Sequence, residues 1–196
     1  MAKNRRCGQA GILSNLDYEK LYNAIKNESH SLILTILRYT GERIGAVVQL
    51  EVLDAYQTPY RSIPRSDILF KAHTRKQAGG RKADTHEVPI CRALGLALSR
   101  YKPPEFGYLF PSPINPERHV TTSSCDKWFR RACTNAGLAQ RGLSLHSPRR
   151  TLATQLHEQG VPLATIKSIT GHKSISSLQR YIDVDDRSRK AAIELL

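Results

Sequence analysis

Residues 145–160 read LHSPRRTLATQLHEQG and predict a helix with a basic start. Pro148 suits the first position of that helix, and Gly160 suits its end. His146 and Arg149 are three residues apart, so both side chains can face one point, where the helix N-terminus itself attracts an anion. A guanidinium fork matches two phosphate oxygens. Taken alone, the stretch fits an anion site and a plain basic helix start capped by His146 equally well.

Residues 170–184 read TGHKSISSLQRYIDV and contain a histidine and a tyrosine, two side chains that can take part in a reaction. Gly171 suits the end of one short helix, and Ser174 is placed to cap a last one. Taken singly, His172 is typical of a helix cap or a buried histidine, and Tyr181 of a tyrosine at the edge of a core. A phenol titrates near ~10, so Tyr181 needs nearby cations or a base before it can attack another atom.

Residues 39–50, YTGERIGAVVQL, place Arg43 between two strongly apolar runs, 32–37 and 44–48. An unpaired guanidinium in such surroundings is costly, so Arg43 should meet either a carboxylate or an external anion. A partner such as Glu42, or a surface arginine whose stem alone is buried, explains Arg43 without any function. Taken alone, the position of Arg43 slightly favours that structural explanation.

The middle of the chain predicts a β-hairpin with a long basic tip. Ile68–Phe70 and Glu87–Ile90 are short strand-like runs, and the polar segment KAHTRKQAGGRKADT between them is broken by two glycines. From Arg61 through Lys82 there are seven Lys or Arg residues against one acid. This is the densest cationic segment of the chain.

The remaining patterns predict one mostly helical α+β domain. Ser14 is placed to cap a first helix, and the run SLILTILRY from Ser31 is too continuous for a surface helix, which indicates a buried one. Thr121 or Thr122 is placed to cap a later helix that Gly137 ends. No Pro/Gly-rich linker and no internal repeat divides the chain, so the helices surround one small sheet in a single domain.

The composition of the 196 residues indicates an intracellular, cytoplasmic protein with a polyanionic partner. Lys and Arg number 30 against 17 Asp and Glu, a net charge of +13, while 40% apolar residues exclude a disordered basic tail. The four cysteines lack metal-site spacing and are typical of reduced thiols. The longest apolar stretch is too short to span a bilayer, and the N-terminus lacks an apolar secretion signal.

The order of Arg43, the basic hairpin, the HxxR pair, the Gly-His pair and Tyr181 resembles the tyrosine recombinase (phage integrase) family. The resemblance runs from about Leu13 to Val184, and the chain is similar to the small single-domain members. It implies the family's catalytic-domain fold, mostly helical α+β with a small antiparallel β-sheet. It also implies a site-specific recombinase that cleaves and rejoins DNA through a 3′-phosphotyrosyl intermediate. Such an enzyme needs no metal or cofactor and acts on double-stranded DNA as a tetramer, associated with the nucleoid.

The resemblance also implies a catalytic site. In the family two arginines, a lysine, two histidines and a tyrosine surround one scissile phosphate, and Tyr181 matches the nucleophile. Lys76 best matches the hairpin lysine, with Lys82 and Lys71 as alternatives. The candidate catalytic residues are therefore Arg43, Lys76, His146, Arg149, His172 and Tyr181.

Three positions depart from the family's pattern. Ala46 stands where the family often has Glu or Asp, three residues after the first arginine, so support of Arg43 should come from elsewhere. Arg150 replaces a second histidine, and Pro148 replaces a leucine. None of these changes removes a reacting group.

We expect a basic leader (residues 1–13), a catalytic domain (14–186) and a C-terminal tail (187–196). Most relatives carry an N-terminal clamp before the catalytic domain, and here only about a dozen residues precede the first helix, so we expect the monomer to bind DNA weakly. In the family the C-terminal segment packs on a neighbouring subunit, which we expect of residues 188–196. A short helix folded back on its own domain is the alternative.

Other functions explain parts of the pattern. A type IB topoisomerase-like enzyme uses the same tyrosine chemistry. A catalytically silent DNA-binding regulator would keep the basic surface but lack one or more of the catalytic residues. A generic RNA- or ribosome-binding protein explains only the charge. The presence of six suitable residues in the family's order favours the recombinase.

Overall fold

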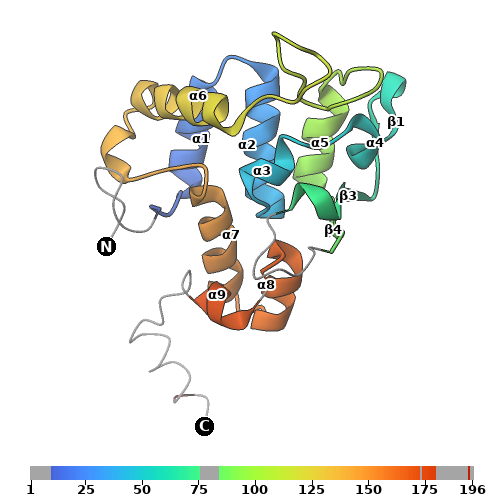
Figure 1. Cartoon of the computed structure of the whole chain (residues 1–196). Coiled ribbons are helices and arrows are strands. Elements are labelled where there is room, and N and C mark those ends of the chain that lie inside the picture. Colours follow the sequence, from blue (N-terminus) through green and yellow to red (C-terminus); the bar gives the residue numbers. More distant parts are fainter. Residues whose placement is uncertain (1–9, 76–83, 173, 180–193, 195–196) are drawn as a thin grey trace.

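Helix α2 (Glu28–Thr40) runs through the middle of the molecule and carries much of the hydrophobic core (Figure 1). Asn27 starts it by accepting the His30 N–H at 3.0 Å, and Gly41, with a φ of +63°, ends it in the left-handed region. Its side chains from 32 to 37 are all buried, which confirms the prediction of a buried helix. The computed structural model describes residues 10–75, 84–172, 174–179 and 194.

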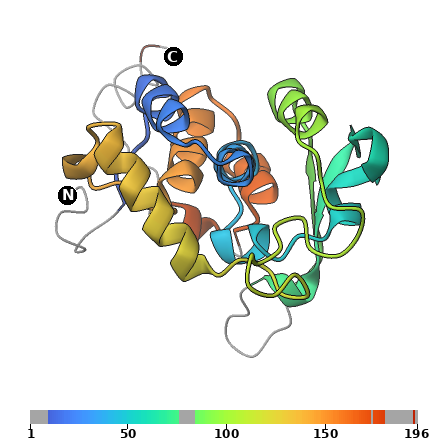
Figure 2. The ribbon, with the colours of Figure 1, turned by 90° about the horizontal axis from the view of Figure 1, so that it is seen from above.

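Two groups of elements flank α2 when the molecule is seen from above (Figure 2). Helices α1 (Asn15–Ala24), α6 (Thr122–Asn135) and α7 (Ser147–Glu158) lie on one side, and α5 (Arg92–Arg100) lies with the strands on the other. Predicted caps start two of these helices. The Ser14 hydroxyl accepts the N–H of Asp17 at 3.1 Å, and the Thr121 hydroxyl accepts that of Ser124 at 3.1 Å.

The strands of the described residues form two small antiparallel pairs. After α3 (Ile44–Val47) and α4 (Val52–Ala55), β1 (Tyr56–Thr58) pairs with β2 (Ile63–Pro64), and β3 (Asp67–Phe70) pairs with β4 (His86–Pro89). In the second pair Asp67 lies opposite Pro89 and Phe70 opposite His86, so the predicted hairpin is confirmed. Its tip, residues 76–83, lies outside the described residues. The β1–β2 pair was not predicted, because two to three residues are too few to show an alternating pattern.

The last described helices pack around a second, smaller core. Helices α8 (Leu163–Thr170) and α9 (Ile175–Gln179) pack with α7 through Ala153, Ile166 and Leu178. Helix α7 starts at Ser147, so Pro148 is its second residue and not the predicted first, and the Ser147 hydroxyl accepts the Ser144 N–H at 3.0 Å. Within the described ranges, three short 3₁₀ turns connect other elements: η1 (Pro59–Arg61), η2 (Ala72–Thr74) and η3 (Ala139–Arg141).

The segment just before α1 is attached to α7. Leu13 is fully buried and its N–H donates to the Thr151 hydroxyl at 2.8 Å, while Arg150 donates to the Ala10 carbonyl at 2.6 Å. The division of the chain near residues 14 and 187 stays a prediction. Among the helices of the described ranges, none is long and apolar enough to cross a membrane.

Truncation of a fully buried side chain of α2 should destabilise the fold strongly. Ile33 is 0% exposed, and we expect Ile33→Ala to lower the free energy of unfolding by about 2–5 kcal/mol, because it removes apolar contacts and leaves a cavity. Leu53→Ala is the control, because Leu53 is 63% exposed and its truncation should change stability by less than about 0.5 kcal/mol. Urea unfolding followed by circular dichroism measures both, and equal losses would contradict the expectation.

Candidate active site

A pocket of about 350 Å³ lies where the starts of α3 and α7 meet the turn η2. It brings together Arg43 and His146, two of the candidate catalytic residues, from distant parts of the sequence. The two residues occupy equivalent places, because Arg43 is the N-cap residue of α3 and His146 that of α7. The pocket is lined by Glu42, Arg43, Ile44, Gly45, Ala46, His73, Thr74, Arg75 and His146.

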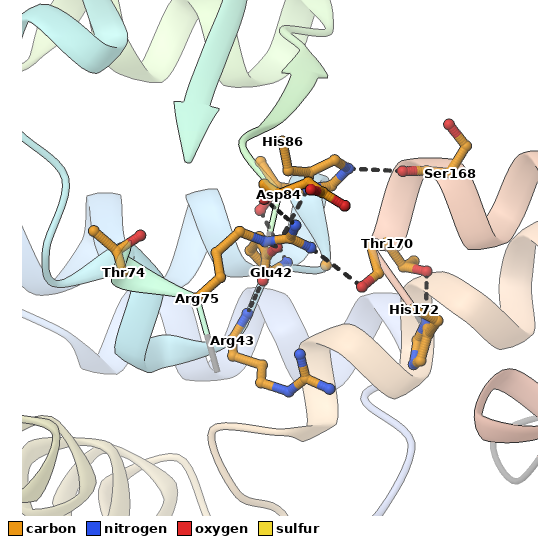
Figure 3. Close-up of polar contacts among 12 residues, drawn as sticks. Glu42, Arg43, Thr74, Arg75, Asp84, His86, Ser168, Thr170 and His172 are labelled. Atoms are coloured by element: carbon orange, nitrogen blue, oxygen red, sulfur yellow. Dashed lines mark hydrogen bonds and ion pairs between the residues drawn. The ribbon is translucent and has the colours of Figure 1, made fainter. Parts of the chain in front are cut away.

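The guanidinium of Arg43 is directed away from Glu42 (Figure 3). Arg43 is partly buried, and its backbone N–H donates to Glu42 Oε2 at 2.8 Å. Within the described part of the chain, its guanidinium makes no hydrogen bond or ion pair. Glu42 is therefore not the ion-pair partner of the Arg43 side chain, and the pocket holds a cation suited to an external anion.

Arg149 is buried to 1% exposure and is held by the ends of two helices. Its Nη1 donates to the carbonyl oxygens of Gly41 and Thr170, both at 2.6 Å, and lies 3.9 Å from Glu42 Oε2. These carbonyls follow or end α2 and α8, where the helix dipole is negative, so a cation is stabilised there. The two bonds fix the direction in which the guanidinium points.

His172 is buried beside the same helix end. Its Nδ1 lies 2.6 Å from the Thr170 hydroxyl, and only 4% of the residue is exposed (Figure 3). Burial, followed by the positive charges of Arg149 and Arg43, lowers the pKa of His172 to about 3. The ring is therefore neutral near pH 7, and it lies within electrostatic range of both candidate arginines.

Two candidate catalytic residues cannot be placed relative to the pocket. Lys76 and Tyr181 lie outside the described residues, as does Lys82, one alternative for the lysine. The other alternative, Lys71, is engaged elsewhere: its ammonium pairs with Glu51 at 2.7 Å and with Asp54 at 3.3 Å, and it does not line the pocket. This ion pairing argues against Lys71. No group of His, Cys, Asp or Glu in the described ranges could hold a metal ion.

Glu42 is the residue of the site whose role was missed. It is 1% exposed, and its Oε1 accepts hydrogen bonds from Arg75 Nε at 2.8 Å and His86 Nδ1 at 3.2 Å. Burial alone would raise its pKa, but hydrogen bonds from His86 and the Arg43 N–H, with the charges of Arg75 and Arg149, lower the pKa of Glu42 to about 2. A buried carboxylate beside the arginines is thus present although position 46 is alanine.

No local signal identified these partners. The sequence suggested Glu42 only as a neutralising partner for Arg43, while Arg75 was one of several basic residues in the hairpin and His86 began an ordinary strand. The three side chains meet because β3 and β4 bring both ends of the hairpin to the start of α3. The family often has an acid three residues after the first arginine; here the buried acid of the site lies one residue before Arg43.

The same arrangement of helices and strands occurs in solved recombinases and integrases. The crystal structure of XerA recombinase has a TM-score of 0.70 at 21% identity, over 96% of this chain and 66% of that one. The Tn1549 transposon integrase in complex with transposon right end DNA has a TM-score of 0.73 at 18% identity, over 97% and 67%. These likenesses establish the fold, which is the predicted tyrosine recombinase catalytic-domain fold.

Sequence comparison identifies the family. A tyrosine recombinase of Pseudothermotoga lettingae is 28% identical over 178 residues, which are 88% of this chain and 56% of the relative. The profile of the phage integrase family matches residues 12–188, and the chain belongs to that family. The chain spans just over half the length of that curated relative. The comparisons favour neither the topoisomerase-like enzyme nor the silent regulator.

The lowered pKa of Glu42 predicts a loss of stability in acid. Its folded pKa of about 2 lies below the ordinary 4.5, so the stabilisation is complete above pH 4.5 and disappears as the pH falls through about 2. The difference in unfolding free energy between wild type and Glu42→Gln should therefore shrink by about 3 kcal/mol over that window. Urea titrations of both proteins at a series of pH values measure the difference. A difference independent of pH would show that the Glu42 pKa is not lowered.

Proposed function

We propose that the protein is a site-specific DNA recombinase that cleaves and rejoins strands through a phosphotyrosyl intermediate. The observation that carries the proposal is the convergence of Arg43 and His146 in one pocket, with Arg149 and His172 buried within electrostatic reach of each other. This is a positive site of the size and donor chemistry that a phosphodiester requires. Membership of the phage integrase family supports the same conclusion.

In the proposed reaction the phenolic oxygen of Tyr181 attacks the scissile phosphorus. A bond forms between the tyrosine oxygen and phosphorus while the bond to the 5′-oxygen breaks, which leaves DNA joined to the protein through its 3′-phosphate. His146 accepts the phenol proton, and Lys76 donates a proton to the departing 5′-oxygen. Attack by the 5′-hydroxyl of another strand reverses these steps. The bond energy stays in the phosphotyrosyl link, so no cofactor is invoked.

The buried groups would stabilise charge on the two nonbridging oxygens. Arg43 and Arg149 supply the positive charge. The carbonyls of Gly41 and Thr170 fix the orientation of the Arg149 guanidinium before DNA binds. His172 is neutral, so it can donate to phosphate only when its Nε2 carries the proton. In the structure the one proton of the Thr170 hydroxyl goes to the Ile166 carbonyl at 2.6 Å, so Thr170 accepts from His172 Nδ1–H at 2.6 Å; a proton on Nε2 requires the Thr170 hydroxyl to turn toward Nδ1 instead.

The proposed partner is double-stranded DNA, bound by a tetramer on paired sites. The net charge of +13 supports a polyanion, and the basic segment between Arg61 and Lys82 is suited to the flanking duplex. A solved relative by fold, XerH, is described as bound to its difH substrate. We propose that residues 187–196 contact a neighbouring subunit, and that the protein acts on DNA at the nucleoid.

Tyr181→Phe should abolish covalent capture of DNA. The assay uses a nicked suicide duplex that carries the inverted or direct repeats bordering the protein's own coding DNA, and denaturing gels detect the adduct. The wild type should form an adduct, and the variant should form none, because the attacking oxygen is absent. An adduct that survives the substitution would refute the assignment of the nucleophile.

Arg43→Ala should slow cleavage far more than it weakens DNA binding. Loss of one preorganised charge at the reacting phosphate costs about 10²–10³ in rate, whereas DNA affinity is spread over many phosphate contacts. Arg118→Ala, at an exposed site, is the matched control and should leave the cleavage rate at saturating DNA unchanged. Single-turnover cleavage and filter binding measure the two quantities; parallel losses in both would contradict the role.

The leaving-group role distinguishes the two remaining lysines. Lys76→Ala should be slow on ordinary DNA and should recover on DNA with a 5′-bridging phosphorothiolate, because a thiolate leaves without a proton. Lys82→Ala should show no such dependence on the substrate. If Lys82→Ala is the variant that recovers, the assignment passes to Lys82.

A further inference from the structure

Two residues close the base of the basic hairpin segment. Arg75 and Asp84 border residues 76–83, and Arg75 Nη1 donates to the Asp84 carbonyl at 2.8 Å (Figure 3). His86 follows at the start of β4. We call Arg75, Asp84 and His86 the neck of the hairpin, since they are the described residues through which the segment joins the rest of the fold.

The two oxygens of Glu42 have different partners. Oε1 accepts from the neck, at 2.8 Å from Arg75 Nε and 3.2 Å from His86 Nδ1. Oε2 faces the candidate phosphate-binding residues, because it accepts the Arg43 backbone N–H at 2.8 Å and lies 3.9 Å from Arg149 Nη1. One buried carboxylate therefore connects the neck to the arginine pocket.

The neck is also tied to the end of α8. Arg75 Nη2 donates to the Gly171 carbonyl at 3.2 Å, and His86 Nε2 lies 2.7 Å from the Ser168 carbonyl. Both ring nitrogens of His86 face acceptors, so the doubly protonated ring makes two hydrogen bonds and the neutral ring one. Gly171 leaves room for this approach, because a β-carbon there would collide with Arg75 Nη2 unless the guanidinium moved.

We propose that Glu42 is a positioning residue that fixes the hairpin neck against the phosphate pocket, and that through the neck it sets the reach of the leaving-group lysine. The inference rests on the proposed function. Buried ion pairs are weak sources of net stability, because desolvation offsets much of their attraction, but their hydrogen bonds define direction closely. A displacement of about 1 Å in a reacting group costs roughly 10²-fold in rate, so direction is what a general acid requires.

Glu42→Gln separates the two sides of this carboxylate. The amide oxygen of glutamine can still accept the Arg43 N–H, while its NH₂ group faces Arg75 Nε–H, which is also a donor, and cannot bond to it; it can bond to His86 Nδ1 only when that nitrogen carries no proton. The hydrogen bond on the pocket side is kept without the negative charge near Arg149, and the Arg75 contact on the neck side is lost. Arg75→Gln breaks the same contact from the partner, whose side chain is 13% exposed, so it is the second variant should Glu42→Gln fold poorly.

The test compares single-turnover cleavage of two suicide duplexes, one ordinary and one with a 5′-bridging phosphorothiolate. Glu42→Gln and Arg75→Gln should cleave ordinary DNA about 10- to 100-fold more slowly than wild type and recover close to the wild-type rate on the phosphorothiolate. Arg43→Ala should stay slow on both. Asp126→Asn, which breaks the exposed 2.6 Å pair with Arg130, is the matched control and should cleave both as wild type does.

Three results would overturn a conclusion. Equal slowing of folded Glu42→Gln and Arg75→Gln on both duplexes would mean that Glu42 acts on the phosphate pocket or on the fold, and not through the lysine. Wild-type rates on ordinary DNA would mean that the neck needs no such anchor. Failure of the wild type to form an adduct with either duplex would instead overturn the proposed function itself.

Discussion

The carboxylate of Glu42 is the contact that joins the two sides of the buried arginine site. Removal of a guanidinium from water is costly, and the cost is recovered only when close partners of opposite charge surround it. Glu42 lies 2.8 Å from Arg75 and 3.9 Å from Arg149, so one carboxylate is close to a cation on each side of the site. Its own burial is offset by hydrogen bonds from Arg75, His86 and the Arg43 N–H.

The hydrophobic core determines where that carboxylate lies. Glu42 follows the end of α2, whose side chains from 32 to 37 and at 40 are buried, so the position of the helix end is set by packing. Gly41 permits close approach of this end to α7 and α8, since a β-carbon there would lie 2.9 Å from Leu152 and 3.2 Å from Thr170. The free carbonyl of Gly41 then reaches Arg149. Gly41 and Glu42, at the end of the buried helix α2, therefore connect the hydrophobic core to the charged groups of the site.

Local signals predicted the elements better than the contacts between distant side chains. Caps, glycine stops and hydrophobic spacing depend on neighbouring residues, so they predicted the helices and the β3–β4 hairpin. The resemblance placed Arg43 and His146 in one site, and they line one pocket. The contacts of Glu42 with Arg75 and His86 join residues 33 and 44 positions apart, and no periodic pattern encodes such a pair. The roles of Lys76 and Tyr181 stay predictions.

The groups of the site are supported by two hydrophobic cores of different size, and the core of α7, α8 and α9 is the smaller one. Among the described residues, Ala153, Ile166 and Leu178 are the buried apolar residues of this unit, fewer than those of the core around α2. The carbonyls of Ser168, Thr170 and Gly171, together with His172, belong to that unit, whereas Arg43 and Glu42 belong to the larger one. The anion site therefore takes its groups from two hydrophobic clusters, and its geometry depends on how α7 and α8 pack against the end of α2.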